Sequence, residues 1–244
     1  MKRFYPFLIA LQFLTRLPVH MAKSPGKHLI GRSLLYYPLV GLILGLVLVA
    51  LNWTLRDASP LLRAALMLTA WEMLTGALHL DGLADSADAW VGGLGSRQRT
   101  LAIMKDPYCG PAAVAALVLV LLIKFAALHS FESSDWLLLL LIPALARSTI
   151  PLLFLTTPYV RPSGLGAVLA AHLPQITGIT AVAATWMAVV IVAGMKGLWL
   201  LLAVGSVFLL LRHAMVQRLG GTTGDTAGAL VELTEAVALV AAAL

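Results

Sequence analysis

The sequence predicts an all-α fold, a polytopic integral membrane helical bundle with about seven transmembrane helices and an N-terminal interfacial or re-entrant helix. Three observations predict it: 60% of the 244 residues are hydrophobic, only 11% are charged, and the mean hydropathy is +0.93. Soluble domains are about 45–50% apolar and about 25% charged. A soluble fold of this length could not bury so much apolar surface, so an ordinary soluble domain and a disordered chain are both excluded.

The apolar runs give the expected helices, because a bilayer core of about 30 Å requires about 20 apolar residues per crossing. Seven runs approach that length, at residues 33–53, 60–80, 112–129, 135–156, 175–195, 197–217 and 227–244. Pro38, Gly41 and Gly45 predict that the first helix is bent and closely packed, since small residues four apart let two backbones approach. We see no internal repeat and no linker, so residues 1–244 form a single integral membrane domain.

The N-terminal segment carries Lys2 and Arg3 ahead of an apolar stretch that Arg16 follows at once. A secretory signal would show a cleavage site of small residues at that point. The pattern therefore favours an interfacial or re-entrant helix near the start of the chain.

Basic residues predict the orientation of the bundle. With the N-terminus in the cytoplasm, the cytoplasmic segments hold eleven Lys and Arg, whereas the opposite loops hold only Arg56 and Lys196. These cytoplasmic segments are residues 1–32, 81–111, 157–174 and 218–226. This positive-inside bias predicts a multi-pass protein of the cell inner membrane whose polar clusters lie on the cytoplasmic face. It also accounts for the net charge of +6, so we expect no nucleic-acid partner, and the sequence leaves a homo-oligomer open.

The densest polar segment runs from His79 to Asp88. On a helix, Asp81, Asp85 and Asp88 fall within an arc of about 60°. Carboxylates this close repel one another unless a cation lies among them. Oxygen ligands suit Mg²⁺, whose coordination is typically completed by substrate phosphates. The alternative is a solvated acidic turn at a helix end, with His79 as hydrogen-bonded support and not as a catalyst.

A second polar segment runs from Gly220 to Gly228. A Gly- and Thr-rich loop that enters a helix offers backbone N–H groups to a phosphate, although an N-cap by Thr223 or Asp225 would explain half of the pattern. On the helix that follows, Asp225, Glu232 and Glu235 span an arc of about 80°. They could therefore face the same cavity as the three aspartates.

Four charged residues fall inside apolar runs: Glu72, Lys124, Arg147 and Arg212. A charge at membrane depth costs several kcal/mol and usually faces the bundle interior, paired or beside a polar cavity. For Glu72 and Arg147 we leave two interpretations open with equal weight. They could have a functional role, or they could form ion pairs that fix the packing of the helices.

Several of these segments are similar to the cobalamin synthase family, the adenosylcobinamide-GDP ribazoletransferases. The resemblance covers nearly the whole chain, in family order. It rests on Phe13-Leu14-Thr15-Arg16-Leu17-Pro18, on His79 through Asp88, on Met104-Lys105-Asp106 with Gly110, and on Gly220-Gly221-x-Thr223-Gly224-Asp225-Thr226-x-Gly228 with Glu232.

The resemblance implies a Mg²⁺-dependent membrane enzyme that joins adenosylcobinamide-GDP to α-ribazole, or to α-ribazole 5′-phosphate. The products would be adenosylcobalamin, or its 5′-phosphate, and GMP, in the late nucleotide-loop assembly of vitamin B12. The implied partners are thus a corrinoid nucleotide, α-ribazole and the lipid bilayer.

Roles follow from this chemistry and from the residue types. Asp81 and Asp85 would hold Mg²⁺, Asp88 or His79 would accept the hydroxyl proton, and Lys105 would offset phosphate charge. The expected substrate-binding residues are Arg97, Asp106, Arg147, Gly221, Thr223, Gly224, Asp225 and Glu232.

Two other classes of protein remain as alternatives. A CDP-alcohol-type phospholipid phosphotransferase also places several aspartates at the mouth of a helical bundle, but the expected Arg and Gly spacing between its aspartates is missing here. A secondary transporter would use charges near the midplane and repeated, broken helices. This chain shows no repeat and concentrates its acidic residues at one face.

Overall fold

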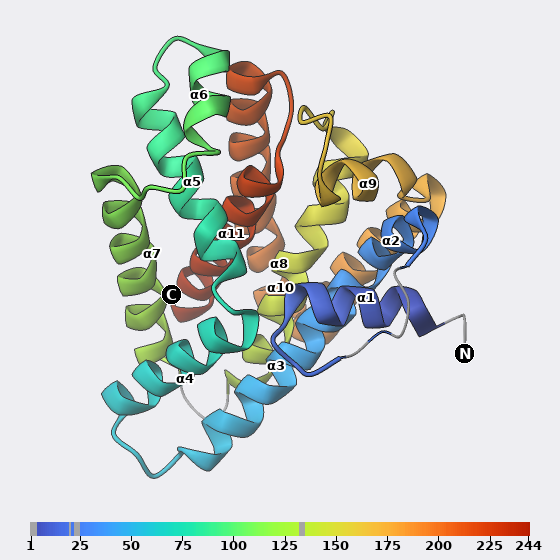
Figure 1. Cartoon of the computed structure of the whole chain (residues 1–244). Helices are drawn as coiled ribbons and strands as arrows, with labels where there is room; N and C mark the ends of the chain where they lie inside the picture. The colour runs from blue at the N-terminus through green and yellow to red at the C-terminus, as the bar shows by residue number, and fades with distance from the viewer. Residues whose placement is uncertain (1–3, 20, 22–24, 132–134) are drawn as a thin grey trace.

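The computed structural model describes residues 4–19, 21, 25–131 and 135–244 and is built from helices (Figure 1). Lys2, Arg3 and Lys23, which contribute to the expected charge bias, lie outside the described residues. The helices in chain order are α1 (Tyr5–Leu14), α2 (Lys27–Ser33), α3 (Tyr37–Thr54), α4 (Pro60–Thr75), α5 (Leu78–Gly92), α6 (Arg97–Ile103), α7 (Pro111–His129), α8 (Trp136–Thr156), α9 (Leu165–His172), α10 (Gln175–Leu219) and α11 (Gly224–Ala243).

The membrane-spanning capacity agrees with a polytopic bundle. Within the described ranges, five helices are long and apolar enough to cross a membrane, or six if the bent pair of α4 and α5 counts as one crossing. We expected about seven transmembrane helices. The structure comes closer to that number because α10, which has 45 residues, breaks at Gly194 (φ 57°, ψ −130°) into two helical arms. The chain folds back there, so that Gly197 lies against the backbone of Val189. The runs 175–195 and 197–217 are thus two arms of one hairpin.

The expected single helix over residues 60–80 is correct as far as Thr75 and wrong beyond it. Helix α4 ends at Thr75, and Gly76 and Ala77 both take left-handed backbone conformations, with φ of 63° and 56°. The chain then turns by 88° into α5. Apolar composition continues across this turn, which is why composition alone does not reveal it.

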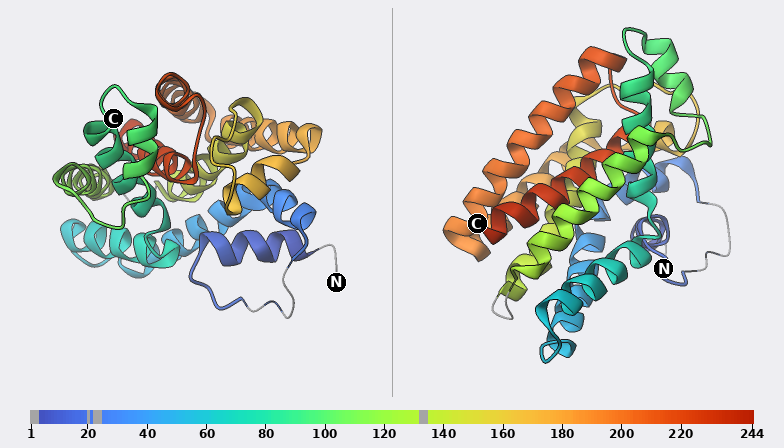
Figure 2. Two further views of the ribbon diagram at one scale, coloured as in Figure 1. Left: turned by 45° about the horizontal axis from the view of Figure 1, so that its top comes forward. Right: turned by 90° about the vertical axis from the view of Figure 1, so that its left-hand side faces the viewer.

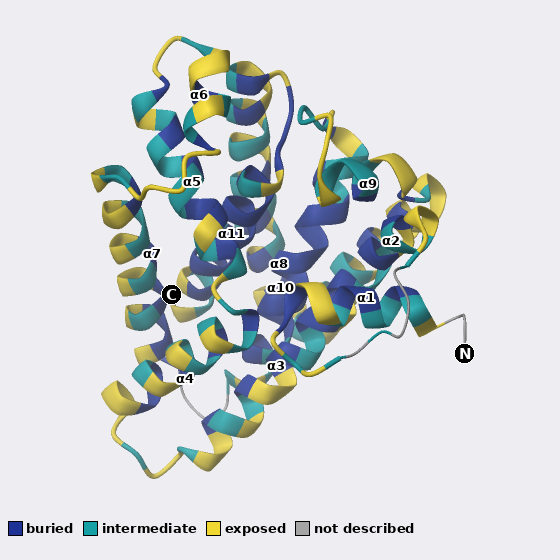
Figure 3. Cartoon of the chain, in the orientation of Figure 1, coloured by how far each residue is buried: buried dark blue, intermediate teal, exposed yellow. Residues whose placement is uncertain are grey.

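Two helices form the centre of the bundle. In their most apolar windows α8 is 78% buried and α11 is 67% buried, against 28% for α7 and 22% for α10. Figure 3 shows the same contrast, with buried residues concentrated on α8 and α11 and exposed ones on the outer helices. Helix α1 is a 10-residue apolar helix that lies across α3 (Figures 1 and 2), and its position at a membrane interface stays a prediction.

Helix α3 packs closely against α8, as Gly41 and Gly45 predict. A Cβ on Gly45 would lie 2.7 Å from the Cα of Leu140, and a Cβ on Gly41 would lie 2.5 Å from the Cα of Ala144. Pro38 occupies the first turn of α3, where it needs no hydrogen-bond partner. The central helix α8 is thereby held against the N-terminal part of the chain.

Replacing Gly45 by alanine should destabilise the bundle by about 1–3 kcal/mol, because the added methyl forces α3 away from α8. The matched control is Gly205→Ala in α10, where an added Cβ meets nothing within 4 Å. Thermal unfolding in detergent measures both. Equal midpoints for the two variants would contradict the close packing of α3 on α8.

Candidate active site

Two glycines bring the two polar segments together, where α5 crosses α11. A Cβ on Gly82 would lie 2.6 Å from the carbonyl oxygen of Asp225 and 3.1 Å from the Cα of Gly228. No larger residue fits at Gly82 without separating the helices. The crossing therefore places the first turns of α5 beside the N-terminus of α11, although Gly82 and Asp225 are 143 positions apart in the chain.

Three carboxylates gather at this crossing. Asp85 interacts electrostatically with Asp225 and Asp81, and the guanidinium of Arg161 is the cation among them. Arg161 lies 2.6 Å from a carboxylate oxygen of Asp225. The prediction that Asp225 faces the same region as the aspartates of α5 is thus confirmed. It is wrong for Glu232 and Glu235, which pair with the buried Lys124 of α7 instead.

Arg161 belongs to a segment that the sequence did not single out. Residues 158–160 pair with the Gly-rich loop: Val160 donates from its N–H to the carbonyl oxygen of Thr222 (2.9 Å), and Thr222 donates to that of Pro158 (2.8 Å). Gly221 lies against the same carbonyl of Pro158 with no room for a side chain. The only available signal was a lone arginine in a short polar stretch between two apolar runs.

Tyr159 and Thr223 fix the start of α11. The N–H of Gly224 donates to the hydroxyl oxygen of Tyr159, and burial raises the pKa of that hydroxyl above its usual value, so it stays protonated. The Thr223 hydroxyl accepts from the N–H of Thr226 (3.2 Å), and the Thr226 hydroxyl accepts from the N–H of Thr223 (2.9 Å). The alternative of an N-cap by Thr223 is confirmed.

Asp88 serves a neighbouring helix. Its carboxylate accepts hydrogen bonds from the N–H groups of Gly110 (2.5 Å) and Ala113 (2.9 Å) at the N-terminus of α7. A negative charge stabilises a helix N-terminus, where backbone donors lack partners. Both carboxylate oxygens are therefore engaged, and a role in proton transfer stays a prediction that this geometry does not favour.

His79 lies on the first turn of α5 and is only 3% exposed. Among the described residues neither ring nitrogen has a hydrogen-bond partner. It lines a cavity together with Asp81 and Asp225. Its predicted place beside the carboxylates is thus observed, and a buried imidazole without partners is free to bond a substrate atom.

The predicted cations of the loop after α5 stay at the surface. Arg97 is exposed and donates to the carbonyl oxygen of Leu219 at the end of α10 (2.6 Å). Lys105 and Asp106 are exposed, and Asp106 accepts from the N–H of Tyr108 (3.1 Å). Their proposed substrate contacts stay predictions, and they border the site without entering the carboxylate group.

A separate group of charges is buried between α4, α7, α8 and α11. The ammonium of Lys124 lies 2.6 Å from Glu72, 2.9 Å from Glu232 and 2.8 Å from Glu235, and 4.8 Å from the ring centre of Trp71. Arg147 pairs with the other oxygen of Glu235. Of the two interpretations, a functional role or ion pairing across helices, the structure shows ion pairing. The group includes Arg147 and Glu232, which we expected to bind substrate.

In the described part of the chain, Glu72, Glu232 and Glu235 are the acidic residues that lie close enough together to hold a metal ion, since one carboxylate oxygen of each lies within 4.8 Å of the others. Lys124 already fills the space between them, so this group binds an ammonium. The aspartates of the α5–α11 crossing are spaced more widely.

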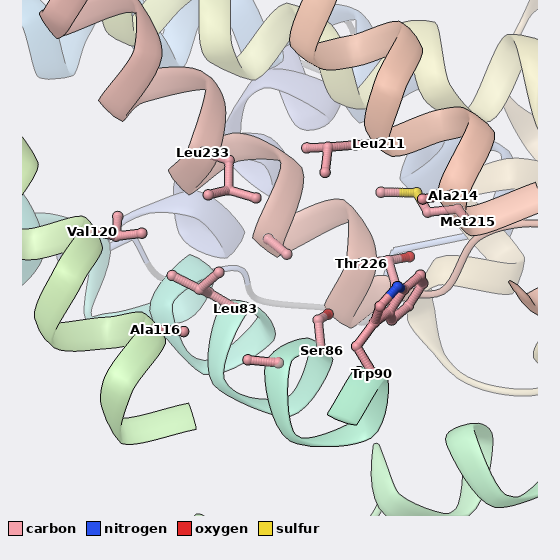
Figure 4. Close-up of a pocket in the computed structure, with 12 residues that line it drawn as sticks. Leu83, Ser86, Trp90, Ala116, Val120, Leu211, Ala214, Met215, Thr226 and Leu233 are labelled. Atoms are coloured by element: carbon pink, nitrogen blue, oxygen red, sulfur yellow. The ribbon is translucent and has the colours of Figure 1, made fainter. Parts of the chain in front are cut away.

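A second cavity lies on the opposite side of α5 and α11, between α7 and the second arm of α10 (Figure 4). It measures about 300 Å³, and its walls include Leu83, Trp90, Val120 and Met215. It contains no carboxylate, so the two sides of the α5–α11 pair differ: one is apolar and the other carries the acidic groups.

The fold and site define an all-α membrane protein with a polar site where two helices cross. The family described as cobalamin-5-phosphate synthase matches residues 6–243, and the chain belongs to this family. It is therefore an enzyme, a transferase of cobalamin synthesis. This match sets aside the phospholipid phosphotransferase and transporter alternatives.

Curated relatives of similar length carry one name, adenosylcobinamide-GDP ribazoletransferase. A protein of Pseudomonas paraeruginosa is 58% identical over 238 residues, covering 97% of both chains. One of Pseudomonas fluorescens is 54% identical over 240 residues, covering 98% of this chain and 99% of the relative. One of Pseudomonas aeruginosa is 57% identical over 238 residues, covering 97% of both. No solved structure matches the chain.

Replacing Lys124 by methionine should destabilise the protein by about 3–5 kcal/mol, because two buried carboxylates and one partly buried carboxylate lose their shared cation. Thermal unfolding in detergent measures the effect. The control is Lys196→Met, whose ammonium lies 3.7 Å from Asp135 and whose side chain is 68% exposed. A Lys124→Met protein that unfolds at the temperature of the control would show that the buried pairs do not hold the helices together.

Proposed function

We propose that the chain transfers the adenosylcobinamide-phosphate group of adenosylcobinamide-GDP to α-ribazole or its 5′-phosphate, with release of GMP. The products are adenosylcobalamin or its 5′-phosphate. The observation that carries the proposal is the group of Asp81, Asp85 and Asp225 at the α5–α11 crossing. The names of the curated relatives support the choice of substrates.

The reaction is attack by a ribose 3′-hydroxyl on the phosphorus that bears the corrinoid side chain. A P–O bond to the ribose forms, the bond to GMP breaks, and the hydroxyl proton leaves. Phosphoryl transfer of this kind depends mainly on positioning and charge neutralisation. Arg161, which already pairs with Asp225, would bring positive charge to the diphosphate.

Magnesium fits this site by its donor set. Asp81, Asp85 and Asp225 supply carboxylate oxygens that interact with one another at the crossing of two helices. Mg²⁺ usually binds through one or two carboxylates plus substrate phosphates. When bound by Asp81 and Asp85, it would neutralise diphosphate charge as a Lewis acid.

Proton removal is the task we assign to His79. Its ring nitrogens have no partner within the described structure and its side chain borders the same cavity as Asp81. A neutral imidazole can take the hydroxyl proton at its unprotonated nitrogen. Asp88, the other predicted acceptor, is engaged at the N-terminus of α7.

We place the enzyme in the cell inner membrane with its active site on the cytoplasmic face. The positive-inside bias of Lys and Arg supports this orientation. The loops around the site, residues 157–164 and 220–223, belong to segments expected in the cytoplasm.

Purified protein in liposomes should release GMP from adenosylcobinamide-GDP only when α-ribazole and Mg²⁺ are both present, and EDTA should stop the release. Chromatographic detection of GMP and of the corrinoid product measures the reaction. Release without α-ribazole would indicate hydrolysis, and no release from folded protein would contradict the proposal.

Replacing Asp81 by asparagine should lower turnover at least about 100-fold and raise the Mg²⁺ concentration needed for half-maximal rate, since a metal ligand loses its charge. The matched control is Asp57→Asn, whose side chain is 92% exposed in the loop between α3 and α4. An Asp81→Asn protein with the turnover and Mg²⁺ dependence of the control would exclude Asp81 as a ligand.

A further inference from the structure

A cavity of about 220 Å³ opens beside the carboxylates, on the side of the α5–α11 crossing that carries Asp81 and Asp225. Six helices contribute to its wall: α1, α3, α5, α8, α9 and α11. Apart from His79, the Tyr37 hydroxyl and the two carboxylates, its side chains are apolar. The cavity is therefore polar where it meets the reaction site and apolar elsewhere.

Aromatic rings form two of the cavity walls. The rings of Phe13 and Tyr37 stack, with centres 6.4 Å apart and planes at 28°. On α8, Phe154 is held edge-on by Tyr159, with centres 5.8 Å apart and planes at 86°. Flat walls of this kind favour a planar aromatic ligand, because offset and edge-on ring contacts add to the burial of apolar surface.

His79 marks the polar end of the cavity. It is 3% exposed, and its two nitrogens lack partners in the part of the chain that the structure describes. A buried polar group without a partner has lost its hydrogen bonds to water without replacement, which is unfavourable. A ligand that places a hydroxyl at His79 would supply the missing hydrogen bond.

We propose that this cavity binds the nucleoside that receives the transferred group, with an apolar bicyclic aromatic base between Phe13, Tyr37 and Phe154. The ribose then lies at His79 and Asp81, where its hydroxyl faces the phosphorus. This assignment rests on the proposed function and names the place of its second substrate.

The guanine of the other substrate fits this cavity poorly. Guanine carries several donors and acceptors along its edge, and each would be buried against aliphatic or aromatic side chains such as Ile150 and Leu169. Burying polar groups without hydrogen bonds is costly. An apolar bicyclic aromatic base, with few donors and acceptors along its edge, avoids most of that cost.

Two substitutions test the proposal: one removes an aromatic wall of the cavity, and the other narrows the cavity entrance. In Phe13→Ala the stacked ring on α1 is lost, and in Leu165→Trp a larger side chain is added at a rim residue that is 41% exposed. Each should raise the KM for α-ribazole about tenfold, with KM for adenosylcobinamide-GDP unchanged. Equilibrium dialysis of α-ribazole against protein without Mg²⁺ or corrinoid should show the same weakening. The control is Phe4→Ala, also near the N-terminus, 69% exposed and outside the cavity.

The outcomes separate this proposal from the proposed function. Normal GMP release with unchanged α-ribazole binding in both variants would overturn the cavity assignment and leave the function intact. A rise in KM for adenosylcobinamide-GDP in place of α-ribazole would also overturn it, since the cavity would then hold guanine. If wild-type protein releases no GMP but binds α-ribazole in a way that Phe13→Ala weakens, the reaction is wrong and the nucleoside cavity stands.

Discussion

The buried charges around Lys124 are the constraint on which the rest of the bundle depends. One ammonium contacts carboxylates of α4 and α11 from its position on α7, and Arg147 adds α8 to the same group. In an apolar surrounding such pairs are costly to break, whereas apolar contacts between helices in lipid have little directional preference. The ion pairs therefore specify which helices meet and at what height, and α11 reaches the site region in a fixed position.

Within this frame, close contacts between helices and loops assemble the candidate site. Gly82 and Gly228 let α5 approach α11 closely enough for carboxylates of both helices to interact. The paired loops at residues 158–160 and 222 add Arg161 from a third direction. Both groups use α11, since Asp225 at its start belongs to the first and Glu235 further along belongs to the second. His79 adjoins both groups: it lines the cavity with Asp81 and Asp225 and interacts electrostatically with Arg147 and Glu235.

Much of this arrangement could be predicted from the sequence. Apolar runs indicated the bundle, the glycine pair of α3 indicated close packing, and helical spacing placed Asp81 and Asp85 on one face. The turn at Gly76 and Ala77 could not be predicted, because the residues on both sides are apolar and the backbone conformation of Ala77 is unusual for its type. The roles of Asp88 and Glu232 were equally hidden, since spacing along one helix gives no information about partners on others.

Helix α5 runs antiparallel to α7, and this arrangement sets how deep the carboxylates lie in the bundle. Asp88 lies at the first residues of α7, whereas Leu83 packs with Val120, further along the same helix. Seven residues of helix from Asp88 to Asp81 correspond to about 10 Å, so the carboxylates lie that far inward from the end of α7. Asp81 is nonetheless exposed, so the site is recessed but still open to water, and the proposed transfer depends on how the acceptor hydroxyl is positioned more than on the exclusion of water.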